Sequence, residues 1–363
     1  MLRSAPEVGL LPEMYMGINM LRKSETLPLR PVSDPVDGPQ PFRRITQFIQ
    51  HGDLPWKSLL MVAVILVVGL MLAIGWMLWQ TSADARAAFG LNFFIPTAEA
   101  NWDPVNDQFQ AWPFIYGTLL TSLAAIVLAV PVSLGIAIFL AEICPPWLRT
   151  PLNWLVELLA AIPSVVYGLW GLFIFLPLVV APVGTALADL LANLPVLGGL
   201  FTGPIPLSGA SRLGAALVLT VMIIPTIAAV SRDVLLAIPA SQREASLALG
   251  STRWETIWQV LLPYGLSGIL GAVILGLGRA LGETMAVTMV IGNSIEGSLS
   301  LLRPGYTMAS IIANEFAEAV TKLHSQALIE VGFALFAMTL LLNILARFLV
   351  WRVASRTQQE ARA

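Results

Sequence analysis

Six long apolar runs, separated by polar or mixed segments, dominate the pattern of the chain. Each run has at least the length of about 20 residues that a helix needs to cross the hydrocarbon core of a membrane. Several runs contain proline, which packed membrane helices tolerate because neighbouring groups satisfy the freed backbone carbonyls. The pattern predicts an all-α membrane protein with six transmembrane helices. The runs occupy 59–79, 114–141, 153–181, 212–231, 264–292 and 327–350.

Lysine and arginine between the apolar runs and at their ends are distributed unequally between alternate segments. One set of segments carries fifteen of them and the other set carries four. Loops that retain positive charge stay in the cytoplasm, so both termini are expected to be cytoplasmic. The segments 80–113, 182–211 and 293–326 are then expected to face outward. The charge pattern thus predicts a multi-pass topology with an even number of spans.

The chain is predicted to have three parts. Residues 1–56 form a polar, proline-rich stretch that is typical of a disordered cytoplasmic tail, residues 57–353 form the transmembrane domain, and residues 354–363 form a second cytoplasmic tail. The first apolar run begins more than fifty residues into the sequence, too deep for a cleaved signal peptide. We therefore interpret that run as a retained spanning helix.

Composition agrees with a membrane protein. Charged residues make up 12% of the sequence and hydrophobic residues 57%, whereas a soluble domain holds about 25% charged residues. The net charge of −2 argues against a nucleic-acid partner. Cys144 is the single cysteine, which excludes an intrachain disulfide and a cysteine metal cluster. His51 and His324 lie far apart and are expected to be solvated loop residues, so no metal site or cofactor is predicted.

The segment 240–263 is the most informative polar segment. Ser241 with Glu244, and Thr252 with Glu255, have the spacing of a capping box, and Gly250 lies between the two pairs. The pattern predicts two short helices joined by a sharp bend at Gly250. A hairpin that only connects two spans is the plain alternative.

The run 264–292 contains ionisable residues at Arg279 and Glu283. Charges inside a membrane are costly and usually face protein or water, and a spacing of four residues places both on one helix face. One reading is a salt bridge that joins helices. The other is an anion step, since a guanidinium fork fits the oxygens of an anion such as phosphate. We take Arg279, Glu283 and Thr284 as the candidate translocation residues.

Two groups of motifs carry a resemblance to a known family. Glu244-Ala-Ser-Leu-Ala-Leu-Gly250, followed after nine residues by Val260-Leu-Leu-Pro263, is similar to the EAA loop of ABC-importer permeases, with Ser246 and Val260 as conservative replacements. The second group resembles the PstC family of permease subunits of phosphate ABC importers. It consists of Trp102-Asp-Pro-Val, Ala161-Ile-Pro-Ser-Val-Val-Tyr-Gly168, the stretch from Gly278 to Val287, and Ala313-Asn-Glu-Phe-Ala317.

The resemblance implies a five-helix type I ABC importer (MetI-like) core preceded by one further span, in the inner cell membrane. It implies that Glu244, Ala245, Gly250 and Pro263 belong to the loop that couples to an ATPase. The implied partners are phosphate, a second PstA-like permease subunit, a PstB-like ATPase dimer and an external phosphate-binding protein, besides membrane lipid. The implied function is a phosphate permease subunit.

The sequence also limits the alternatives. None of its three lysines completes a phosphate-binding loop of the form Gly-x-x-x-x-Gly-Lys-Ser/Thr, so the chain is expected not to be an enzyme, and a partner is expected to hydrolyse ATP. A permease for another oxyanion such as sulfate, molybdate or phosphonate remains the first alternative. An ion-coupled secondary transporter is a weaker one, because it has no use for an ATPase-coupling loop.

Overall fold

The computed structural model describes residues 53–96, 102–191, 198–295 and 297–360, with side chains as far as Arg352. The predicted N-terminal tail therefore lies outside the described residues as far as residue 52. Contacts divide the chain into a first unit, Met1–Val67, and a second unit, Val68–Ala363. The first unit contributes the beginning of helix α3, and all contacts discussed below lie within the second unit.

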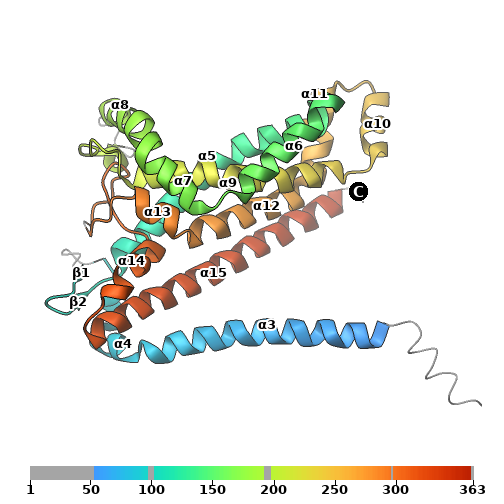
Figure 1. The fold of residues 1–363 in the computed structure, drawn as a ribbon. Coiled ribbons are helices and arrows are strands. Elements are labelled where there is room, and N and C mark those ends of the chain that lie inside the picture. Colours follow the sequence, from blue (N-terminus) through green and yellow to red (C-terminus); the bar gives the residue numbers. More distant parts are fainter. Residues whose placement is uncertain (1–52, 97–101, 192–197, 296, 361–363) are drawn as a thin grey trace, which may run out of the picture. The chain divides into compact units, whose positions relative to one another are not determined.

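Helices make up almost all of the described structure (Figure 1). In chain order the elements are α3 (Asp53–Thr81), α4 (Ala83–Phe89), η3 (Gly90–Phe93), β1 (Trp102–Asp103), β2 (Gln108–Phe109), α5 (Trp112–Ile138), η4 (Phe139–Ile143), α6 (Pro146–Ala161), α7 (Ser164–Trp170), η5 (Gly171–Val180), α8 (Ala181–Leu191), η6 (Gly198–Phe201), α9 (Arg212–Leu236), α10 (Ala240–Ala248), α11 (Arg253–Thr256), η7 (Ile257–Leu261), α12 (Leu262–Gly282), α13 (Met285–Val290), α14 (Met308–Glu315), η8 (Phe316–Glu318) and α15 (Lys322–Glu360).

The prediction of six spans is confirmed. Within the described residues, six helical segments are long and apolar enough to cross a membrane. The chain is therefore an all-α, multi-pass membrane protein, apart from the two-residue strands β1 and β2. The six segments are Trp56–Thr81, Trp112–Ile143, Ser164–Leu191, Arg212–Leu236, Arg253–Gly282 and Lys322–Arg352.

The third apolar run differs from its prediction, because 153–181 is not one helix. Helix α6 ends at Ala161, Ile162 is extended with φ −62° and ψ 131°, and α7 begins at Ser164. Pro163 causes this break, since it lacks a backbone N–H and its ring disfavours a helical conformation at Ile162. The third span therefore starts after the break and continues through η5 and α8.

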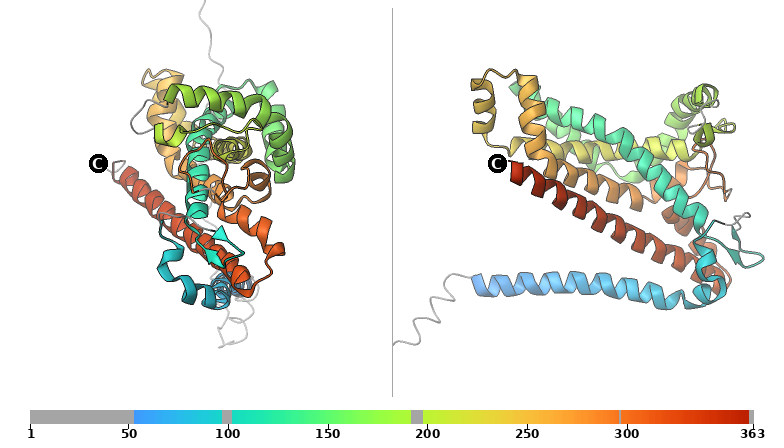
Figure 2. Two further views of the ribbon diagram at one scale, coloured as in Figure 1. Left: turned by 90° about the vertical axis from the view of Figure 1, so that its left-hand side faces the viewer. Right: turned by 180° about the vertical axis from the view of Figure 1, so that it is seen from behind.

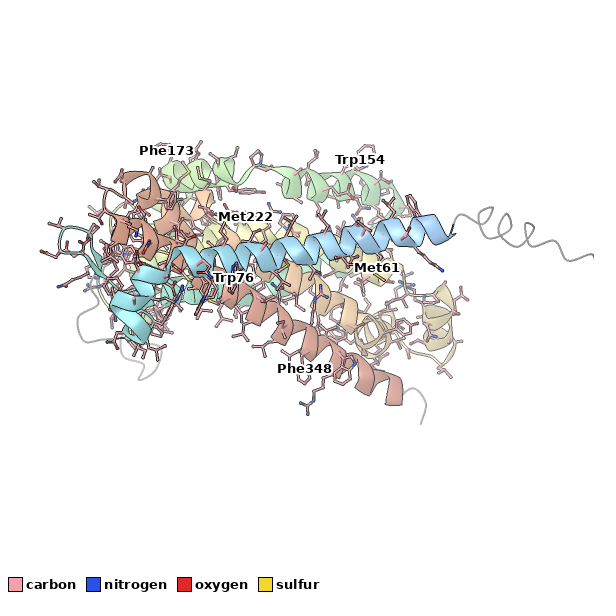
Figure 3. All side chains as sticks on the ribbon, turned by 90° about the horizontal axis from the view of Figure 1, so that it is seen from below. Met61, Trp76, Trp154, Phe173, Met222 and Phe348 are labelled. Atoms are coloured by element: carbon pink, nitrogen blue, oxygen red, sulfur yellow. The ribbon has the colours of Figure 1, made fainter. Side chains whose placement is uncertain are left out.

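Helix α9 forms the centre of the second unit. Two thirds (67%) of its most apolar window is buried, against 33% or less for the other five spans. Met222 of α9 is fully buried, whereas Trp154, Phe173 and Phe348 are more than half exposed (Figure 3). An exposed apolar surface of this kind suits lipid or a partner helix better than water.

The polar ends of the second unit carry different structures (Figures 1 and 2). At one end lie α10, α11 and the C-terminal end of α15; we call this the coupling-loop end, after the role predicted for the segment 240–263. At the other, β1 and β2 form an antiparallel hairpin near α14, with Trp102 opposite Phe109; we call this the hairpin end. The polar segments therefore gather at the two ends of the spans.

Candidate functional site: the break in span five and the coupling loop

The fifth predicted run, 264–292, is interrupted at the predicted ion pair, and the spanning helix Arg253–Gly282 ends there. Helix α12 ends at Gly282, Glu283 is extended with φ −69° and ψ 123°, and the short helix α13 begins at Met285. The prediction that Arg279 and Glu283 share one helix face is therefore wrong, because the helix ends between them. In the described part of the chain, no ion pair joins these two side chains. A salt bridge between them is thus not the arrangement of this structure.

Arg279 is directed at a neighbouring span. Its Nη1 donates to Thr226 Oγ1 of α9 at 3.2 Å. The positive charge of Arg279 also interacts electrostatically with the hydroxyl of Tyr167 in α7. The side chain is half-buried, as expected for a charge that faces protein or water rather than lipid. The sequence analysis missed Thr226, which lies in an apolar span, and it named Tyr167 only as part of a motif.

Glu283 and Thr284 organise the break itself. The Glu283 carboxylate accepts the N–H of Ala286 at 3.1 Å, which satisfies one of the free donors at the start of α13. Thr284 Oγ1 donates to Gly282 O at 3.2 Å, and both residues are half-buried. The three candidate residues therefore surround one helix interruption, with a cation on one side and a carboxylate on the other.

Two motifs that are distant in sequence pack together at this break. A Cβ on Gly168 of α7 would lie 2.7 Å from Met289 Sδ and 3.0 Å from the Cα of Ala286, so only glycine allows this approach. The glycine belongs to the motif that ends at residue 168, and Ala286 belongs to the motif around Arg279. The structure thus brings two of the family-like motifs into one site.

The coupling loop has the predicted bend at Gly250. Gly250 has φ +92°, its N–H donates to Leu247 O at 3.0 Å, and the N–H of Ser251 donates to Ser246 O at 3.3 Å. These two bonds form a Schellman motif, the usual way to end a helix on a left-handed residue. The predicted bend at Gly250 and the short helix before it are confirmed, but the second helix is not short, because α11 continues through η7 and α12 as the fifth span, Arg253–Gly282.

One of the two predicted capping boxes is present. Thr252 accepts the N–H of Glu255, and the Glu255 carboxylate accepts the N–H of Thr252 at 2.7 Å. The box predicted for Ser241 is wrong, because α10 begins at Ala240 after Pro239, so Ser241 already lies inside the first turn. Ser246, a replacement in the family motif, bonds Thr256 across the bend at 3.0 Å.

The predicted coupling residues lie on and beside this bend. Glu244 and Ala245 are exposed on α10, and a Cβ on Gly250 would meet no atom within 4 Å. Pro263 lies in the first turn of α12. Because α12 has 21 residues and rises about 1.5 Å per residue, the coupling loop and the break at Gly282 are about 30 Å apart. The structure therefore contains two separate candidate sites joined by one helix.

At the hairpin end, a histidine differs from its prediction. His324 is 5% exposed, stacks on Phe109 with ring centres 5.2 Å apart, and lies 3.1 Å from Glu315 Oε2, so it is no solvated loop residue. The same Glu315 oxygen accepts Trp102 Nε1–H at 2.7 Å. Burial raises the pKa of Tyr306 in the same cluster. The hydrogen bond from Asn314 lowers this pKa, and the nearby carboxylates raise it further. Two further family-like motifs thus meet here.

A chain of six spans, with a bent helical loop at one end and an interrupted span carrying charges, has the architecture of a type I ABC importer permease. Residues 133–359 match the family described as "Binding-protein-dependent transport system inner membrane component", and the chain belongs to this family. It is therefore a multi-pass inner-membrane component of a transport system.

Individual proteins with known names are also similar to this chain. The chain is 46% identical to the phosphate transport system permease protein PstC of Xylella fastidiosa over 84% of this chain and 93% of the relative. It is 47% identical to PstC of Pasteurella multocida over 76% of this chain and 84% of the relative. The fold is similar to a crystal structure of a bacterial ABC transporter involved in the import of the acidic polysaccharide alginate, with a TM-score of 0.52 and 15% identity over 85% of this chain and 99% of the other.

Proposed function

We propose that this chain is a transmembrane permease subunit of an ATP-driven importer of inorganic phosphate. The observation that carries the proposal is the similarity to PstC proteins, which extends over 84% of the chain at 46% identity. The interrupted fifth span supports it with suitable chemistry, since an arginine and a carboxylate stand on the two sides of one helix break. Another oxyanion remains the competing substrate class.

Arg279 is proposed to receive the anion. A guanidinium presents a planar fork of donors that matches phosphate oxygens, and its bond to Thr226 Oγ1 occupies only one of its five N–H groups. The Glu283 carboxylate can accept a hydrogen bond from the protonated oxygen of hydrogen phosphate, a donor that fully deprotonated sulfate lacks. Thr284, beside Glu283, offers a hydroxyl that can form a hydrogen bond with the anion as the anion passes the break.

The bent loop at residues 240–263 is proposed to couple the permease to a separate ATPase. Glu244 and Ala245 are exposed on α10, and Leu249 beside Gly250 is 89% exposed, which suits insertion of this bend into a groove on a partner. The coupling loop then faces the cytoplasm, as do both termini. The partners proposed are a PstB-like ATPase dimer, a PstA-like second permease and an external phosphate-binding protein.

Uptake by the assembled complex tests the function. The complex is purified from its own cells through a tag on this chain, its subunits are identified by mass spectrometry, and it is reconstituted into liposomes. We expect ATP-dependent uptake of radioactive phosphate that excess unlabelled phosphate abolishes and excess sulfate, molybdate or a phosphonate leaves unchanged. Uptake that sulfate abolishes would instead assign the chain to another oxyanion, and uptake without ATP would favour a secondary transporter.

A further inference from the structure

Arg243 of α10 joins three elements at the coupling-loop end. Its Nε and Nη2 donate to Glu142 Oε1 at 3.0 and 2.7 Å, and Glu142 lies in η4, at the end of the second span. Its Nη1 donates to Ile238 O and its Nη2 to Leu235 O, both at 2.6 Å. These two carbonyls lie at the C-terminal end of α9, the fourth span. One side chain therefore contacts the ends of two spans from the coupling helix.

The surroundings strengthen these bonds. The side chains of Arg243 and Glu142 are 22% and 16% exposed, so their charges are screened less than those of a surface pair. Leu235 O lies in the last turn of α9 and Ile238 O lies two residues beyond it, at the negative end of the helix dipole, which favours a cation there. The carboxylate and the two carbonyls all attract the positive charge of the guanidinium, and together they hold it in one position.

Packing beside the ion pair is incomplete. A cavity of about 220 Å³ is lined by Glu142 and Arg243, together with Leu247 of α10 and Ile257 of η7. Below it, a buried apolar cluster joins the ends of spans two and four to span five, with Ala137, Ile138, Ala141, Leu235, Ile238, Ile257, Leu261, Leu262 and Ile269. No residue of α10 is in that cluster, and the hydrogen bonds of Arg243 and Ser246 join α10 to the ends of the spans.

We propose that Arg243 is the positioning residue that transmits movement of α10 to the ends of the second and fourth spans. This inference rests on the proposed function, in which an ATPase docks on the coupling loop. When the docked ATPase moves α10, the guanidinium moves Glu142 and the end of α9 with it. Without this connection the ATPase still docks and hydrolyses ATP, but its movement reaches the spans only through the chain at Gly250 and Pro239 and through the bond between Ser246 and Thr256.

The transport ratio of an Arg243→Gln complex tests this role. We expect the ATPase to co-purify normally and the phosphate transported per ATP hydrolysed to fall about tenfold, because hydrolysis then continues without the movement of the span ends that transport requires. Lys322→Gln is the control, because it also removes a cation but from an exposed position at the start of α15, outside the coupling loop, and its ratio should equal that of the unaltered complex. An unchanged ratio in Arg243→Gln overturns the proposal.

A milder variant keeps the test decisive if Arg243→Gln fails to assemble. Glu142→Gln keeps an acceptor oxygen but removes the charge, so a smaller fall in the transport ratio is expected. A ratio equal to that of the unaltered complex overturns the proposal here too.

A structural measurement separates this inference from the proposed function. Spin labels are placed on Ser241 of α10, which is exposed, and on Ile143 of η4, which is 52% exposed. In the full complex we expect one narrow distance distribution, which broadens in Arg243→Gln. Identical distributions would overturn the positioning role even if phosphate transport is normal. Conversely, a complex that transports no phosphate refutes the proposed function while leaving this measurement valid.

Discussion

The carboxylate of Glu283 accepts the backbone N–H of Ala286 at 3.1 Å, across the interruption that separates α12 from α13. Arg279, four residues earlier, is directed instead to Thr226 Oγ1 at 3.2 Å. The two charges therefore have different partners and can be altered separately. A carboxylate at the start of a helix both satisfies a free N–H and leaves its second oxygen available for a passing ligand.

Removal of the arginine is the first prediction. Arg279→Gln should lower phosphate uptake by about tenfold or more, because a hydrogen bond to a charged group contributes about 1.5–3 kcal/mol. Arg279→Lys should recover only part of the uptake, since lysine offers a point charge rather than a fork. Thr226→Val is the control for the partner of Arg279 and should have the smaller effect. Uptake is measured per assembled complex.

The double variant Arg279→Gln/Glu283→Gln separates a transport role from a structural one. If the two charges only neutralise each other, removing both should restore uptake, because neither charge is then left unpaired. We expect no recovery, since the structure does not pair them. Glu283→Gln retains an acceptor for the Ala286 N–H, so it tests the charge without removing the cap.

The second prediction concerns the bend of the coupling loop. Gly250 has φ +92° and open space around its Cβ, so Gly250→Val is penalised by the backbone conformation rather than by a clash. We expect loss of uptake and loss of the co-purifying ATPase, with the permease still in the membrane. Gly250→Asn is the matched control, because asparagine adopts this conformation more readily. Normal uptake with a normally bound ATPase in the valine variant would disprove this role.

The third prediction tests the orientation in the membrane. Cysteines at Val105 and Val320, which are 90% and 94% exposed, should react with an impermeant reagent from outside intact cells. A cysteine at Leu249, 89% exposed on the coupling loop, should react only after permeabilisation. The natural Cys144 is buried and gives little background. Labelling of Leu249→Cys in intact cells would reverse the proposed topology.

The spans could be predicted because the length and hydrophobicity of an apolar run can be read directly from the sequence. An apolar run of sufficient length must satisfy its backbone within a helix, whatever it packs against. The breaks after Ala161 and Gly282 could not be predicted in this way, because the apolar pattern resumes within a few residues of each of them. Pro163 was a possible signal, but prolines such as Pro225 lie within continuous helices of the same chain.

Side-chain partners depend on tertiary structure and were predicted less well. Thr252 and Glu255 bond within one turn, and their spacing alone predicted the capping box. His324 is buried against Phe109, more than two hundred residues away, and no local pattern indicates that contact. The bonds of Arg243 to Glu142 also join residues far apart in sequence, at a separation of 101. Local spacing thus predicted local bonds and missed those that hold the spans together.

The last prediction concerns a buried ion pair near the hairpin end. Arg86 Nη1 lies 3.0 Å from Glu330 Oε2, and the side chain of Glu330 is only 2% exposed. Arg86 also donates to Ser82 Oγ and stacks over the Trp79 ring, with 3.7 Å to its centre. This contact joins the end of α3 and the start of α4 to α15. The ion pair between Arg86 and Glu330 should therefore contribute to the free energy of unfolding of the protein.

Arg86→Gln should destabilise the protein by about 3–5 kcal/mol, because it leaves the Glu330 carboxylate buried without its cation. The double variant Arg86→Gln/Glu330→Gln should recover much of this loss, since no buried charge remains. The control is Lys322→Gln, which breaks an exposed pair with Asp84 and should cost less than about 1 kcal/mol. Unfolding of the purified protein in detergent measures all three. A double variant as unstable as Arg86→Gln would show that the loss comes from the Trp79 and Ser82 contacts rather than from the stranded carboxylate.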